Sequence, residues 1–179
     1  MISTLLHNSW LYLNSADFLQ HVVNNRFYLI FLVIALSFLK RHTFSGIIMT
    51  SLVNIPGTIL HETAHFMVGL ILNAKPASFN LLPKRRDNTY VMGSVGFRNI
   101  KFYNAFPSSM APLLLLPLAY WLNEYFLVTT IWRYLCFILL ETIIIENAIP
   151  SSTDFKVAFS HPLGLLFYGG IACALVLFL

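Results

Sequence analysis

The stretch Gly57-Thr58-Ile59-Leu60-His61-Glu62-Thr63-Ala64-His65-Phe66-Met67-Val68-Gly69-Leu70 places two histidines and a glutamate within an apolar run. Residues four apart lie on the same face of an α-helix, so both imidazoles can reach one metal ion. Glu62 lies about 100° around such a helix from His61, where its carboxylate can contact a water held by that ion. Because neutral imidazole is a good zinc ligand, the spacing predicts a zinc site with Glu62 as the base that takes a proton from water.

The apolar setting of this motif strengthens the prediction. A charged side chain in the middle of a membrane helix costs about 2.5–3.5 kcal/mol on insertion scales, so such residues are kept for a function or a firm partner. The alternative interpretation is a polar cluster that holds neighbouring helices together by hydrogen bonds without chemistry.

The composition is that of a membrane protein. Of the 179 residues, 58% are hydrophobic and 10% are charged, whereas a soluble domain carries about 25% charged residues. We expect one transmembrane domain over 1–179, an all-α polytopic membrane protein with about five transmembrane segments and a small membrane-associated β-hairpin. The predicted segments are 26–39, 44–73, 109–122, 125–146 and 162–179, with a kink or break at Pro56 because proline lacks a backbone N–H.

The basic residues predict the orientation of these segments. Eight of them fall on one side of the predicted membrane: Arg26, Lys75, Lys84, Arg85, Arg86, Arg98, Lys101 and Lys156. Lys40 and Arg41 fall on the other side, and Arg133 lies within the fourth segment. The excess of basic residues predicts that the amino terminus and the 74–108 loop are cytoplasmic. This explains the net charge of +4 without a nucleic-acid partner.

The loop over 76–100 is predicted to form the β-hairpin. Its runs 77–83 and 90–97 look extended, and they flank a polar turn at 84–89. Gly93 and Gly96 would weaken a central strand but suit an edge or a bulge.

A catalytic zinc site needs a third protein ligand and keeps its fourth position open. The best candidate stretch follows the fourth segment, at Glu146-Asn147-Ala148-Ile149-Pro150-Ser151-Ser152-Thr153-Asp154. The predicted topology puts this stretch at the same membrane depth as His61 and His65. Glu146 and Glu141 are rival ligands, since one class of membrane zinc protease takes its third metal ligand from a glutamate of a later helix. His161 is also close enough in sequence to be considered.

The chain resembles the site-2 protease family of intramembrane zinc metalloproteases over about residues 44–160. The resemblance is carried by His61-Glu62-Thr63-Ala64-His65 and by Asn147-Ala148-Ile149-Pro150…Asp154, with Ala111-Pro112 in the segment between them. It implies that His61, His65 and Asp154 bind zinc, that Glu62 is the catalytic base, and that Asn147 positions the substrate or polarises its carbonyl. The chain departs from the family pattern at Phe155, where glycine is usual.

These features together predict a zinc metalloendopeptidase that cleaves a membrane-anchored protein or peptide substrate, with partner chains as regulators. The resemblance also implies the bacterial inner membrane, with the active site toward the cytoplasm. The main alternative is a membrane scaffold or partner subunit with a structural zinc site. A metal-handling protein is a third reading, disfavoured because no second His/Asp cluster marks a path for ions.

Overall fold

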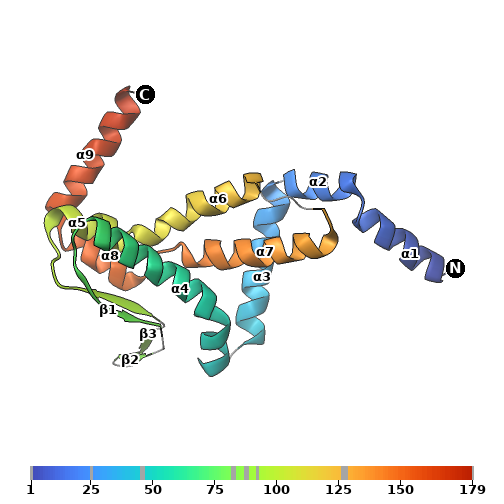
Figure 1. Ribbon diagram of the computed structural model, residues 1–179, viewed down its shortest axis with the longest axis horizontal. Helices are drawn as coiled ribbons and strands as arrows, with labels where there is room; N and C mark the ends of the chain where they lie inside the picture. The colour runs from blue at the N-terminus through green and yellow to red at the C-terminus, as the bar shows by residue number, and fades with distance from the viewer. Residues whose placement is uncertain are drawn as a thin grey trace.

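The protein is described from a computed structural model that defines residues 2–24, 26–44, 47–81, 84–86, 89–91, 93–125 and 129–178. Over these residues the chain is mostly helical, with four short strands. The molecule is elongated, with the amino terminus at one end and the last helix projecting from the other (Figure 1). The predicted class, helical with a small β-hairpin, is therefore confirmed.

The helices follow the apolar runs of the sequence but differ from the predicted segments in their bounds. They are α1 (Ile2–Leu13), α2 (Ala16–Asn24), α3 (Arg26–Thr43), α4 (Ile47–Ile71), α5 (Phe102–Ser109), α6 (Leu115–Tyr125), α7 (Ile131–Asn147), α8 (Ser152–Phe159) and α9 (Pro162–Phe178), with a 3-10 turn η1 at Ala111–Leu114. Helices α1 and α2 lie outside the five predicted segments.

Helix α4 carries the histidine motif and contacts α7, α5 and η1. It runs without interruption through Pro56, so the predicted break is absent. Proline removes one backbone hydrogen bond from a helix, but packing of the neighbouring turns can offset that loss. Here the next residue, Gly57, lies so close to α7 that a Cβ atom would overlap the Asn147 side chain. This close contact between α4 and α7 keeps the two helices together at the level of the motif.

No single helix among the described residues is both long enough and apolar enough to cross a membrane. Two bent pairs meet the length and composition requirement together: α5 with the following Ala111–Tyr125 helix, at 53°, and α7 with α8, at 42°. The third predicted segment, 109–122, overlaps the second member of the first pair, and the fourth, 125–146, overlaps α7, the first member of the second pair. The five transmembrane segments remain a prediction.

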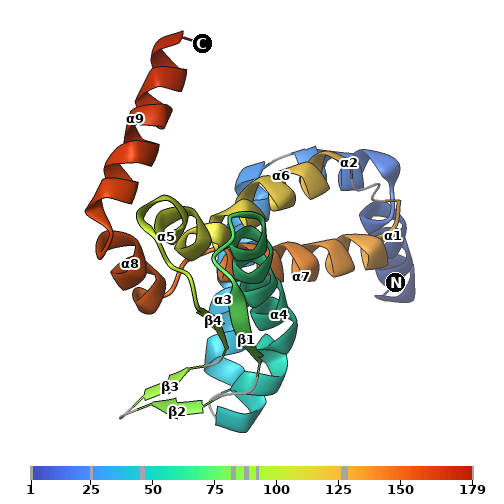
Figure 2. The same ribbon diagram turned by 60° about the vertical axis from the view of Figure 1, so that its left-hand side comes forward.

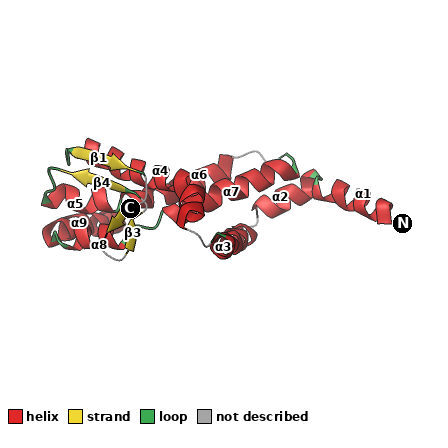
Figure 3. Ribbon diagram, turned by 90° about the horizontal axis from the view of Figure 1, so that it is seen from below, coloured by secondary structure: helices red, strands yellow, loops and turns green. Residues whose placement is uncertain are grey.

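The predicted hairpin is present, and its strands lie within the predicted range 76–100. Strand β1 (Pro76–Asn80) pairs antiparallel with β4 (Ser94–Phe97), and β2 (Lys84–Arg86) pairs with β3 (Thr89–Val91) beyond them. The prediction of a polar turn over 84–89 is therefore wrong, since β2 and β3 extend the hairpin into that stretch. Both β1 and β4 lie along α4, as Figures 2 and 3 show.

Two clusters of buried apolar residues hold the helices in place. The first joins α2 to α7 through Leu19, Tyr134, Phe137 and Ile138. The second joins α6 to α7 through Leu115, Ala119, Ile144 and Ala148, and Leu60 of α4 packs against it. Because Leu60 precedes the first histidine of the motif, the second cluster sets the position of that histidine relative to the end of α7.

Lys40 of α3 forms an ion pair with Glu146 of α7 and donates a hydrogen bond to Asn54 of α4 at 3.0 Å. The predicted topology put Lys40 and residue 146 on opposite faces of the membrane. Groups in contact cannot be separated by a hydrocarbon layer about 30 Å thick. Lys40 and Glu146 therefore cannot lie on opposite faces as predicted, and the orientation of the chain in a membrane stays a prediction.

Candidate metal centre

The two histidines of the motif point to the same side of α4. Their Nε2 atoms lie 3.2 Å apart, and their rings are 4.8 Å apart between centroids. The Nδ1 atom of His61 bonds the carbonyl oxygen of Asn147 at 2.8 Å, and that of His65 bonds the carbonyl oxygen of Ser108 at 2.7 Å. A carbonyl oxygen only accepts, so each Nδ1 carries a hydrogen, and in the neutral form of either ring the lone pair is on Nε2.

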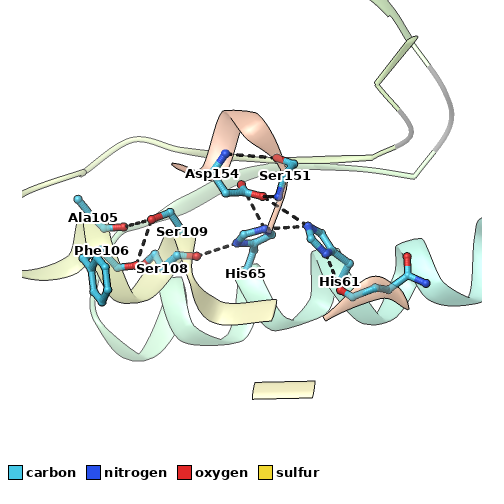
Figure 4. A network of polar contacts seen from close by, with 9 residues as sticks. His61, His65, Ala105, Phe106, Ser108, Ser109, Ser151 and Asp154 are labelled. Carbon is cyan, nitrogen blue, oxygen red and sulfur yellow. Dashed lines mark hydrogen bonds and ion pairs between the residues drawn. The ribbon is translucent and has the colours of Figure 1, made fainter. Parts of the chain in front are cut away.

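Asp154 approaches the same two nitrogen atoms from α8. Its Oδ1 lies 3.3 Å from His65 Nε2, and its Oδ2 lies 3.6 Å from His61 Nε2 (Figure 4). The carboxylate also accepts a hydrogen bond from the Ser151 backbone N–H at 2.7 Å, as part of the capping box that begins α8. The first turn of α8 therefore fixes the carboxylate in front of the histidines.

These three side chains have the chemistry of a zinc site. Within the described part of the chain, His61, His65 and Asp154 form a group whose ligand atoms lie within 4.8 Å of one another. Two neutral imidazole nitrogens and one carboxylate are a ligand set that zinc enzymes use, with one position left for water or substrate. The Nδ1 hydrogen bonds supply the outer shell that such ligands usually have. The residues present therefore fit a zinc ion.

Glu62 lies beside this group and is only 5% exposed. Its carboxylate accepts a hydrogen bond from the backbone N–H of Val95 in β4. A cavity of about 730 Å³ is lined by Glu62, by the three metal-site residues and by residues of β4. The hairpin thus forms one wall of the cavity, and α4 forms another.

Asn147, which the sequence predicts to act on the substrate, lines the same cavity. Its main-chain carbonyl supports His61. Its side-chain Nδ2 donates to the Ile143 carbonyl at 2.8 Å, one turn back in α7. The structure therefore shows Asn147 holding a histidine through its backbone, and the predicted contact with substrate stays a prediction.

The rival ligands are not part of the converging group found among the described residues. Glu146 lines the cavity, but one carboxylate oxygen is paired with Lys40. Glu141 is buried in α7 and is outside the group of converging ligand atoms. His161 contacts Ser160 Oγ and the Val157 carbonyl through its Nδ1. Among the candidates named from the sequence, the structure brings Asp154 to the two histidines.

Ser108 and the β4 contact to Glu62 were missed by the sequence analysis. The supporting groups are a backbone carbonyl and a backbone N–H, which every residue carries and no motif reveals. Gly93 is an exception, because its residue type already indicated a special position in the strand. It was assigned to an edge or a bulge, and its Cα lies so near Glu62 that a Cβ would come within 2.6 Å of Glu62 Oε1.

No protein-family model, no curated protein and no solved structure matches this chain. The function must therefore be argued from the geometry of the metal centre and of the cavity beside it.

Proposed function

We propose that this protein is an intramembrane zinc metallopeptidase that hydrolyses a peptide bond of a membrane-anchored substrate. One observation carries the proposal. Two histidines of α4 and a carboxylate from α8, far apart in sequence, converge with their ligand atoms within 4.8 Å, while Glu62 faces the cavity at the same place.

The chemistry follows from these groups. Zinc, when bound, lowers the pKa of a coordinated water to about 7 and polarises a carbonyl oxygen. Glu62 accepts a proton from the attacking water as the new C–O bond forms, and it passes that proton to the amide nitrogen as the C–N bond breaks. The products are a carboxylate and an amine. Burial of Glu62 and its hydrogen bond to Val95 hold the carboxylate in one orientation for both transfers.

Strand β4 provides a place for an extended substrate. One edge of β4 pairs with β1, and the Val95 N–H on its other edge is directed to Glu62 at the cavity. A peptide unwound from its helix could add to this edge by main-chain hydrogen bonds. Substrates N-methylated at alternate backbone positions near the scissile bond should then lose affinity with a period of two residues. A loss that does not depend on position would contradict this binding mode.

The membrane setting is part of the proposal. Large apolar side chains are exposed along α3, α6 and α9, including Phe38, Trp121 and Val176, and a lipid environment would cover them. Exposed basic residues Lys75, Arg98 and Lys101 flank the base of the hairpin. A basic flank beside the cavity favours an active site toward the cytoplasm. The bacterial inner membrane is proposed from the family resemblance.

A structural zinc site in a scaffold is the competing function. Structural sites are usually closed by four protein ligands, whereas here three ligands lie next to a cavity with an unused glutamate. That difference favours catalysis.

The test compares the wild type with Glu62→Gln, both purified from membranes in detergent. We expect both proteins to contain about one zinc ion, since Glu62 is not a ligand, and only the wild type to cleave single-span membrane peptides. The variant should lose at least about 100-fold in rate, the scale of a general base. If the zinc-loaded wild type cleaves no more than Glu62→Gln over a broad set of peptides, the peptidase function is rejected. The scaffold with a structural zinc site is then the function that remains.

A further inference from the structure

Ser108, at the end of α5, has a buried hydroxyl group without a hydrogen-bond partner. The residue is 1% exposed, and its Oγ has no hydrogen-bond partner among the described residues. The adjacent Ser109 differs, because its hydroxyl donates to the carbonyl oxygens of Ala105 and Phe106 at 2.7 and 3.0 Å (Figure 4). Buried hydroxyls nearly always have a partner, so an unpaired one beside a cavity calls for a ligand.

The backbone of Ser108 ties this hydroxyl to the metal centre. Its carbonyl oxygen accepts the hydrogen bond from His65 Nδ1, and Ser108 lines the cavity that also contains Glu62 and Asp154. Ser108 therefore supports one of the proposed metal ligands, His65, through its backbone carbonyl. A change at its side chain leaves this backbone contact in place.

Asn147 also lines the cavity, and its amide nitrogen carries two donor hydrogens, of which one is bonded to the Ile143 carbonyl. The Ser108 hydroxyl differs, because it has no partner among the described residues. Among the described residues, the unpartnered buried side-chain atoms that line the cavity belong to Ser108 and Glu146. The glutamate oxygen accepts when it is ionised, whereas the serine hydroxyl can donate.

We propose that the Ser108 hydroxyl donates a hydrogen bond to the carbonyl oxygen of the peptide bond being cleaved. This inference rests on the proposed peptidase function and names the donor for its substrate. Negative charge develops on that oxygen as water adds to the carbonyl carbon. A donor already in place in a dry site stabilises that charge without reorganisation, so its effect falls on the chemical step.

The experiment compares Ser108→Ala with Ser109→Ala in the full-length, zinc-loaded protein. Ser108→Ala should lower kcat by about 100-fold with little change in KM, as expected for the loss of one such donor. Ser109→Ala should behave as wild type, and both variants should retain zinc. Ser108→Cys, which keeps the side-chain volume but is a weak donor, should reproduce the loss if the alanine variant does not fold.

A second measurement does not require turnover. Acetohydroxamate is titrated into the cobalt-substituted proteins and followed by visible absorption. Its affinity should fall about tenfold in Ser108→Ala, the size of one hydrogen bond to a charged oxygen, and should be unchanged in Ser109→Ala.

The outcomes separate the two claims. Equal kcat in Ser108→Ala and the wild type, while Glu62→Gln is inactive, overturns the role of Ser108 and leaves the peptidase intact. If the wild type itself cleaves nothing, the peptidase fails, and the peptide carbonyl fails with it as the acceptor. A selective loss of hydroxamate affinity in Ser108→Ala then supports only a hydrogen bond from Ser108 to an oxygen bound at the metal, and equal affinities in the two serine variants overturn that hydrogen bond as well.

Discussion

At the scale of single residues, each of the three candidate metal ligands is held in place by a hydrogen bond to a backbone group. Each histidine presents Nε2 because its Nδ1 is bonded to a carbonyl oxygen of another helix. Asp154 is fixed in the same way by the first turn of its own helix. Preorganised ligands lose little conformational entropy when a metal binds, which favours a tight site.

Asp154 has two roles that substitution can separate. Asp154→Asn keeps an oxygen for the Ser151 N–H but removes the anionic ligand, so zinc affinity should fall by more than the 10- to 100-fold typical of outer-shell changes. Ser151→Ala removes the helix cap, which costs about 1 kcal/mol of stability, and should leave zinc bound. Competitive chelator titration and thermal unfolding measure the two effects. Full zinc affinity in Asp154→Asn would transfer the ligand role to another carboxylate that lines the cavity, Glu146 or Glu62.

At the scale of elements, the hairpin is the wall that positions the base. Strand β4 reaches Glu62 through a backbone N–H, and Gly93 lies against both Glu62 and Thr58. Glycine is required here by close approach of the backbone to the Glu62 side chain, not by an unusual backbone angle.

Gly93→Ala should therefore displace Glu62 without touching the metal ligands. A Cβ at this position would lie 2.6 Å from Glu62 Oε1 and 2.6 Å from Thr58 Cγ2. A displacement of about 1 Å at a catalytic group can lower the rate roughly 100-fold, so we expect kcat to fall and zinc content to stay. Gly170→Ala is the matched control, since a Cβ there meets nothing within 4 Å. Equal rates for the two variants would show that β4 does not position the base.

At the scale of the whole molecule, the metal would join parts of the chain that are distant in sequence. Its ligands come from α4 and α8, which share no cluster of buried apolar residues in the described structure. A ligand that binds only the folded state stabilises it by about 2.7 kcal/mol at 100 times its Kd.

Removal of zinc should for this reason lower the Tm of the detergent-solubilised protein by roughly 5–10 °C. Restoring zinc should return the original Tm. His65→Ala, which lacks one ligand, should show no response to chelator. A wild-type Tm that is insensitive to chelator would mean that no metal links α4 to α8.

The membrane prediction also belongs to this scale. If the exposed apolar faces of α3, α6 and α9 contact lipid, the protein should remain in the membrane pellet after extraction with alkaline carbonate, and detergent should release it. Release by carbonate alone would contradict an integral membrane protein, and the exposed apolar residues would then need a protein partner.

The sequence by itself determined the elements whose geometry is local. Spacing of four residues puts His61 and His65 on one helix face wherever that helix lies, and turn-flanked extended runs predict a hairpin from neighbouring residues. Both features are present in the structure. Of the kink or break predicted at Pro56, the break is absent, since α4 continues through this residue. Gly57 packs there against Asn147 of α7, and that contact is not local in the sequence.

Only the tertiary structure decided which carboxylate meets the histidines. A carboxylate is carried by each of three residues in a short stretch: Asp154, Glu146 and Glu141. Sequence spacing alone does not show which of them binds the metal. The 42° bend between α7 and α8 turns Asp154 toward His61 and His65, while Lys40 engages Glu146 from a third helix. Convergence of this kind depends on the angles between helices, which arise from packing of the whole chain and from no single segment of it.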